Sequence, residues 1–141
     1  MTRYLSAIGP RALAAGLFLS TVLGGTTFAQ TPFTATLSGP GNGSGMATVN
    51  VDPGASTVCY DLTVDLTPPA TAAHIHRGEA GANGPIVVPF ESPASGSASG
   101  CVQGVDAGVI SDILANPAGF YVNVHNPDFP GGAIRGQLTP Q

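Results

Sequence analysis

The chain has 141 residues, of which 20 are glycine, 13 are proline and only 9% are charged, and its formal net charge is −4 at pH 7. It contains no lysine, so it lacks the basic surface that would bind nucleic acid or an anionic membrane. The glycine and proline content favours short strands joined by many turns.

Residues 1–29 have the pattern of a secretory signal peptide. Arg3 and Arg11 form a basic start, an apolar run follows over 12–23, and small residues precede a cleavage point after Ala29. The apolar run is short for a bilayer span, although an uncleaved membrane anchor is the alternative. Cleavage would leave residues 30–141 as one domain with two arginines against eight carboxylates, a formal charge of −6. We therefore expect an exported protein, periplasmic or extracellular, with no stable membrane insertion after cleavage.

Short segments in which apolar and polar residues alternate recur along the rest of the chain, with turn residues between them. The clearest is 57–66, where Val58, Tyr60, Leu62 and Val64 share one parity, which indicates a sheet with one buried face. The predicted strands are 33–37, 47–51, 57–66, 72–77, 86–90, 97–103, 120–125 and 133–139.

One segment has helical spacing instead. Asp106 can cap a short helix near 107–115 through its carboxylate, and Asn116-Pro117 ends it. About eight short antiparallel strands with one short helix predict an all-β domain, either a Greek-key β-sandwich or a barrel.

The two cysteines, Cys59 and Cys101, are predicted to form one disulfide, as expected for an even number in an exported chain. If Ser99 and Gln103 point outward, Cys101 faces the same way as Cys59, and the bridge lies outside the core. A pair of metal-binding thiolates is the alternative, but no Cys-x-x-Cys motif is present.

The chain contains three histidines. His74 and His76 share a face of the predicted strand 72–77, because side chains two positions apart lie on one side of a sheet, about 6.5–7 Å apart. His125 ends the strand 120–125. If that strand lies beside 72–77, three neutral imidazoles converge, a ligand set that suits zinc or copper(II). The alternative is three solvated strand residues that bind nothing.

Other polar residues share the parity of this candidate metal site. Tyr121 and Asn123 do so on the strand of His125, and Arg135 and Gln137 do so on the last strand, which is expected to pair with it as a hairpin. Arg135 could instead be a structural cation that bonds a carboxylate or turn carbonyls. Glu79, in the turn after His76, could be that partner, a fourth ligand, or simply a solvated carboxylate.

Several catalytic patterns are missing from the sequence. There is no Gly-x-Ser-x-Gly elbow, no paired carboxylates with glycosidase spacing, and no acidic calcium loop. The glycine-rich stretch 78–84 precedes a predicted strand rather than a helix, so it is not a phosphate loop.

The segments AHIHRGEAGANGPIVVPF and GFYVNVHNPDFPGGAIRGQL resemble the CHRD domain, named for chordin and common in exported bacterial proteins. The resemblance extends from about Phe33 to Leu138. It implies an all-β domain outside the cytoplasm but no established reaction. The strongest matches are residues 73–76, the Gly78/Gly81/Gly84-Pro85 spacing, 121–125 and 132–137, so they contain all three histidines and Arg135.

Three functions follow as expectations. The first is a non-catalytic binding module with one metal ion, copper or alternatively zinc, on the three histidines. The second is a structural or adhesive β-domain without metal. The third is a metal-dependent redox enzyme, since His-x-His on such a strand is similar to copper-zinc superoxide dismutase. That dismutase holds two metals with more histidines than this chain has. The partner is expected to be an unidentified protein or the metal ion itself.

Overall fold

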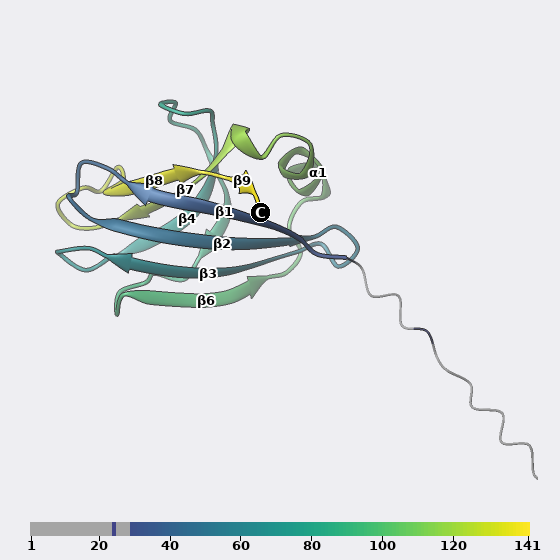
Figure 1. Ribbon diagram of the computed structural model, residues 1–141, viewed down its shortest axis with the longest axis horizontal. Coiled ribbons are helices and arrows are strands. Elements are labelled where there is room, and N and C mark those ends of the chain that lie inside the picture. Colours follow the sequence, from purple (N-terminus) through teal and green to yellow (C-terminus); the bar gives the residue numbers. More distant parts are fainter. Residues whose placement is uncertain (1–23, 25–28) are drawn as a thin grey trace, which may run out of the picture.

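The computed structural model describes Gly24 and residues 29–141. Except for positions 24 and 29, the signal peptide expected at 1–29 lies outside the described residues. The described part forms strands β1 Thr31–Ser38, β2 Ser44–Asp52, β3 Thr57–Asp65, β4 Ala72–Arg77, β5 Ile86–Phe90, β6 Ser97–Val102, β7 Phe120–His125, β8 Ile134–Gln137 and β9 Thr139–Pro140, with the helix α1 Ala107–Ala115 and a 3₁₀ turn at Pro117–Gly119 (Figure 1).

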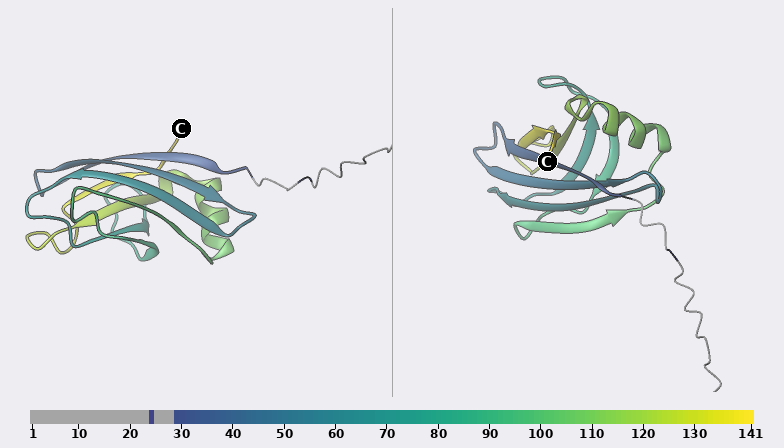
Figure 2. Two further views of the ribbon diagram at one scale, coloured as in Figure 1. Left: turned by 90° about the horizontal axis from the view of Figure 1, so that it is seen from below. Right: turned by 45° about the vertical axis from the view of Figure 1, so that its right-hand side comes forward.

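The strands form one antiparallel sheet in the order β5-β4-β7-β8-β1-β2-β3-β6, with β9 paired to β1. The sheet curls into a nearly closed barrel, as the two views of Figure 2 show. At the seam, Tyr60 of β3 stacks on Phe90 of β5 with ring centroids 4.0 Å apart, and the Tyr60 hydroxyl accepts a hydrogen bond from the Glu91 amide. These contacts link β3 to the end of β5, one of the two edge strands of the sheet. The all-β prediction is confirmed in its barrel form.

Alternation along each strand places the apolar set inside the barrel. In β3, Val58, Tyr60, Leu62 and Val64 are buried, while the residues between them are less so. The predicted last strand 133–139 differs from the structure, because it divides into β8 and β9. Leu138, between them, is fully buried and donates its amide to the Phe120 carbonyl. β8 lies between β7 and β1 and pairs with both, whereas β9 pairs with β1.

Helix α1 lies at one end of the barrel (Figure 1). Asp106 caps it by accepting a hydrogen bond from the Val109 amide at 3.0 Å, as predicted. Ile110 and Ile113 are buried in the core, so the helix closes that end by burying apolar surface. None of the described residues belongs to a helix long and apolar enough to cross a membrane.

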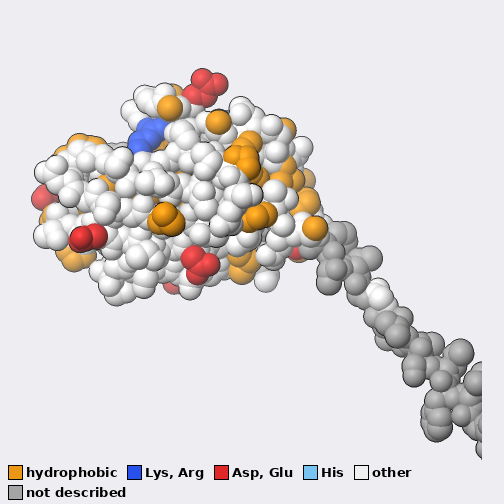
Figure 3. Space-filling model, viewed as in Figure 1, with side chains coloured by type: hydrophobic (Ala, Val, Ile, Leu, Met, Phe, Trp, Pro, Cys, Tyr) orange, Lys and Arg blue, Asp and Glu red, His pale blue; other side chains and the backbone are white. Residues whose placement is uncertain are grey.

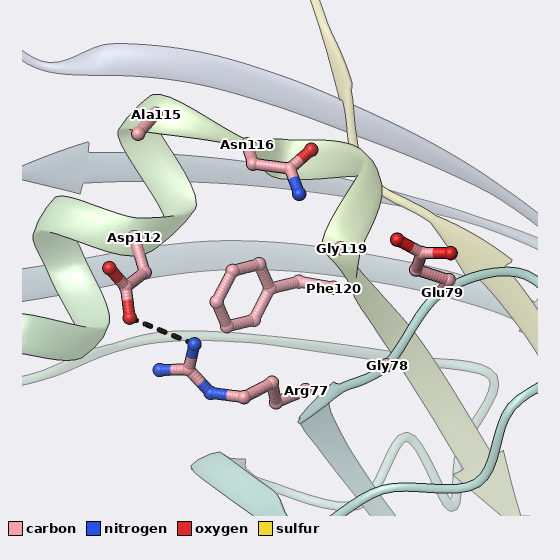
Figure 4. A pocket seen from close by; sticks show the side chains of 8 residues that line it. All are labelled: Arg77, Gly78, Glu79, Asp112, Ala115, Asn116, Gly119 and Phe120. Carbon is pink, nitrogen blue, oxygen red and sulfur yellow. Dashed lines mark ion pairs between the residues drawn. The ribbon is translucent and has the colours of Figure 1, made fainter.

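A polar pocket separates α1 from the ends of β4 and β7. Arg77 bridges it, with its guanidinium 2.8 Å from Asp112 of the helix and 4.9 Å from the ring centroid of Phe120 (Figure 4). Both partners of this ion pair are well exposed, so it contributes at most about 1 kcal/mol to stability.

The predicted disulfide is present. Cys59 and Cys101 are direct neighbours across β3 and β6 and are bonded to each other. Both side chains are on the outer face, since Cys101 is exposed and Cys59 half-buried. In the view of Figure 3 the surface is mostly uncharged, with a few separate carboxylates.

Candidate metal centre

The three histidines lie together on the outer face of the barrel because β4 and β7 are adjacent. In their antiparallel register Ala72 faces His125, His74 faces Asn123, and His76 faces Tyr121. Residues that face each other across such a pair point to the same side of the sheet. His125 is therefore diagonal to His74, and the two histidines of β4 are successive residues on that face.

Their ring nitrogens converge. One nitrogen from each of the three imidazoles lies within 4.8 Å of the others, and Nδ1 of His74 is 3.2 Å from Nε2 of His125. The ring centroids of His74 and His76 are 5.5 Å apart. This is the convergence that a shared metal ion requires and that parity alone could not establish.

Backbone carbonyls fix the tautomers of two of the rings. Nδ1 of His76 lies 2.8 Å from the Gly84 carbonyl oxygen, and Nδ1 of His125 lies 2.9 Å from that of Pro130. A carbonyl oxygen can only accept, so each Nδ1 carries the proton and donates it. Each Nε2 then presents a lone pair, which is the arrangement that orients metal-binding histidines in proteins.

The ligand atom of His76 has no other hydrogen-bonding role in the described part of the chain. His76 is only 8% exposed, and its Nε2 is buried without a hydrogen-bond partner among the described residues. A buried polar atom left unpaired costs about 1–3 kcal/mol. A metal ion on this lone pair would remove that cost.

The environment favours the neutral form of the other two rings. Burial is the main cause that lowers the pKa of His74 below 6.5, and His125 and His76 add to the effect. Burial also lowers the pKa of His125; the bond to the Pro130 carbonyl opposes this in part, and His76 lowers it further. Neutral imidazole is the form that binds metal, so both lowered pKa values favour binding.

A metal ion fits the measured spacing. An equilateral triangle with 4.8 Å sides, the upper limit of the separations, puts each nitrogen about 2.8 Å from its centre. Metal–imidazole bonds are about 2.0–2.1 Å, so each nitrogen has to move by less than about 0.8 Å. Small rotations of the half-buried His74 and His125 rings, with a smaller shift of the buried His76 ring, provide such a movement.

The other residues predicted at the site form its border toward β8. The ring of Tyr121 stacks on His76 with centroids 5.0 Å apart and planes 10° apart. On the side of β8, the guanidinium carbon of Arg135 is 3.4 Å from the Tyr121 ring centroid. Gln137 donates to the carbonyls of Gly78, Ala118 and Phe120. These residues touch the cluster or its loop but are not themselves ligands.

Comparison with known proteins identifies the family of this chain. The family model of the CHRD domain matches residues 22–138, well over half of the chain. The chain belongs to the CHRD domain family. No curated protein and no solved structure matches it.

In this CHRD domain Asn123 lies at the centre of the polar face, between His74 of β4 and Arg135 of β8. It is 4% exposed, and its amide nitrogen makes a long contact of 3.4 Å to the Gly131 carbonyl. Its Oδ1 has no hydrogen-bond partner among the described residues. Asn123 thus borders the cluster but is oriented toward the 126–133 loop.

Glu79 is not part of the three-histidine cluster. Its side chain is exposed and lines the pocket of Arg77 and Asp112 (Figure 4). Arg135 bonds neither a carboxylate nor a turn carbonyl among the described residues; its partners are the Tyr121 ring and, at 3.4 Å, the Asn83 side chain. The planar guanidinium of Arg135 therefore stacks on an aromatic ring and does not bond a carboxylate or a turn carbonyl, the two partners considered from the sequence.

Two loops of the CHRD domain cover this face, which parity did not predict. Residues 78–85 and 126–133 fold over it and bury Tyr121 and Asn123, the outward residues of β7, whereas its inward residues are buried inside the barrel. Tyr121, only 1% exposed, lies outside the main apolar core cluster and is buried under the 78–85 loop. The carbonyls of Gly84 and Pro130, which orient two histidines, belong to these loops. The available signal was the Gly-rich spacing after His76.

Proposed function

We propose that this CHRD domain binds one transition-metal ion, copper(II) in preference to zinc(II), through His74, His76 and His125, and that it acts as a non-catalytic metal-binding module outside the cytoplasm. The observation that carries this proposal is the convergence of three imidazole nitrogens within 4.8 Å, with two rings oriented by backbone carbonyls.

The donor set supports copper over zinc. All three donors are imidazoles, which suit both ions, but copper(II) binds a given nitrogen site more tightly than zinc(II) does. Three protein ligands leave at least one coordination position for water or a small ligand. His74 and His125 are only half-buried, whereas His76 is buried, so solvent reaches the site from the side of His74 and His125.

The proposed location outside the cytoplasm has separate support. Cys59 and Cys101 form a disulfide. Disulfides persist in oxidising compartments and are rare in the cytosol. The pattern of residues 1–29 is that of a secretory signal peptide. Both features favour an exported module.

The test is a titration of residues 30–141, purified without a histidine tag, with copper(II) and with zinc(II). We expect a one-to-one copper complex by calorimetry, with hyperfine splitting from coordinated nitrogen in the electron paramagnetic resonance spectrum. His125→Ala should weaken binding at least a hundredfold. Thr63→Ala, an exposed residue on β3, is the control and should bind as wild type does.

The proposal would be overturned if the wild-type protein bound copper(II) no more tightly than isolated surface histidines do. The structural or adhesive role would then be preferred, with the histidines linking β4, β7 and their loops by hydrogen bonds. Tight binding that survives His125→Ala would place the metal elsewhere and would also contradict the proposal.

A further inference from the structure

Three successive groups stack across β8, β7 and β4 on the outer face. The guanidinium of Arg135 covers the Tyr121 ring at 3.4 Å, and that ring lies nearly parallel to the imidazole of His76 at 5.0 Å. Tyr121 is on the middle strand of the three, so Arg135 and His76 approach it from opposite sides. Arg135 is therefore beyond the reach of a metal on His76, and any effect it has on that metal is indirect.

The same groups hold the 78–85 loop. Nη1 of Arg135 is 3.4 Å from the Asn83 side-chain oxygen, and the Tyr121 hydroxyl accepts the Gly84 amide at 3.1 Å. The Gly84 carbonyl, in turn, accepts the Nδ1 proton of His76. The chain of contacts thus runs from Arg135 and Tyr121 to Asn83 and Gly84, and from Gly84 to the ligand.

The 78–85 loop packs so closely against β4 that the His76 ring has little room to rotate. A Cβ atom at Gly84 would overlap the Arg77 carbonyl oxygen, so the loop backbone is pressed against β4 at the point where it meets the imidazole. If the loop moved away, Nδ1 of His76 would lose its acceptor, and the proton could move to Nε2. An imidazole protonated on Nε2 cannot bind metal through that atom.

We propose that Arg135 is a positioning residue for His76: by holding Tyr121 and the 78–85 loop in place, it keeps the His76 proton on Nδ1 and Nε2 free to bind metal. The consequence for metal affinity rests on the proposed function, whereas the consequence for the His76 tautomer does not. Arg135 is a suitable anchor because its plane stacks on the ring while its edge reaches Asn83.

The chain offers a matched control in Arg77. Its guanidinium also lies over an aromatic ring, that of Phe120, but on the other side of the sheet, where it pairs with Asp112 (Figure 4). Arg77→Met removes a stacked arginine from the strand that carries His76 without touching the outer-face stack. Arg135→Met removes the stack itself.

The experiment is a long-range proton–nitrogen correlation spectrum of nitrogen-15-labelled protein, residues 30–141, with chelator at pH 8, where imidazoles are neutral. In wild type and Arg77→Met we expect His76 as a single Nδ1–H tautomer. In Arg135→Met a substantial fraction should be the Nε2–H tautomer, and copper affinity should fall about tenfold or more, as for other outer-shell partners of metal-binding histidines. Asn83→Ala, at an exposed loop position, should shift the tautomer in the same direction if Arg135→Met does not fold.

An unchanged tautomer in folded Arg135→Met, or an Nε2–H tautomer in wild type, would overturn the positioning role. If wild type shows the Nδ1–H tautomer and Arg135→Met loses it, but neither binds metal, the positioning role holds and the proposed function fails. If wild type binds copper tightly and Arg135→Met has the same tautomer and affinity, the proposed function holds and Arg135 has only a structural role.

Discussion

Nδ1 of His74 lies 3.2 Å from Nε2 of His125, although 51 positions separate the two residues in the sequence. Nδ1 of His125 donates to the Pro130 carbonyl, so its Nε2 is an acceptor and, in the metal-free protein, His74 donates to it. Ligands bonded to one tetrahedral ion at about 2.0–2.1 Å are themselves about 3.3 Å apart. The hydrogen bond therefore already holds the two rings at the spacing of metal ligands.

His125→Gln should separate metal binding from folding. In chelator the variant loses hydrogen bonds worth about 1 kcal/mol each, so we expect a modest loss of unfolding free energy. With free copper at a hundred times the wild-type Kd, wild type should gain about 2.7 kcal/mol, and the variant almost none. Urea unfolding with chelator measures the loss of unfolding free energy, and urea unfolding with copper measures the stabilisation by the metal. Equal stabilisation of the two proteins by copper would contradict a site containing His125.

The metal-free domain should become less stable as the pH falls below about 6.5. The folded-state pKa values of His74 and His125 are lowered by burial, so the unfolded chain binds protons first. The stabilisation from their neutral forms is complete above 6.5, the unfolded pKa, and is lost as the pH falls through the folded pKa values. Urea unfolding between pH 7.5 and 5.5 should show this slope. Its persistence in the double variant His74→Gln, His125→Gln would assign it to other groups.

Gly84→Ala should weaken metal binding more than it weakens folding. The added Cβ would overlap the Arg77 carbonyl oxygen, so the loop must shift and the Gly84 carbonyl must leave Nδ1 of His76. We expect copper affinity to fall about 10- to 100-fold, as when an outer-shell partner is removed. Gly131→Ala is the control, because a Cβ there meets nothing within 4 Å. Similar affinities for both variants, measured by competition with a chelator, would argue against the loop's role.

Removing the disulfide should destabilise the domain and spare the metal centre. The bridge joins residues 42 positions apart, and closing a loop of that length restricts the unfolded chain by about 4 kcal/mol. The variant Cys59→Ser, Cys101→Ser should unfold at lower urea with unchanged copper affinity, because β3 and β6 are not neighbours of β4 or β7. A large loss of affinity in the folded variant would show coupling that this strand order does not explain.

Local features of the fold could be predicted from the sequence. Period-two alternation located the strands, Asp106 and Pro117 defined the limits of the helix, and parity predicted that Cys59 and Cys101 face the same side. These features depend on a residue and its near neighbours, because side chains alternate across a strand and a capping carboxylate bonds an amide three positions on. The same alternation predicted that His74 and His76 lie on one face of their strand and that His125 lies on the polar face of its own strand.

Only the tertiary structure decided whether those histidines meet. The adjacency and register of β4 and β7 follow from closing the whole sheet into a barrel, which no short segment encodes. The orientation of His76 and His125 depends on the carbonyls of Gly84 and Pro130, and carbonyls carry no sequence signal because every residue has one. Arg135 was on the right face by parity, but its stacking partner and its reach to Asn83 depend on where the 78–85 loop folds. The sequence thus determines which residues can be ligands. The distances between their ring nitrogens, their tautomers and their burial are determined by the packing of distant strands and loops.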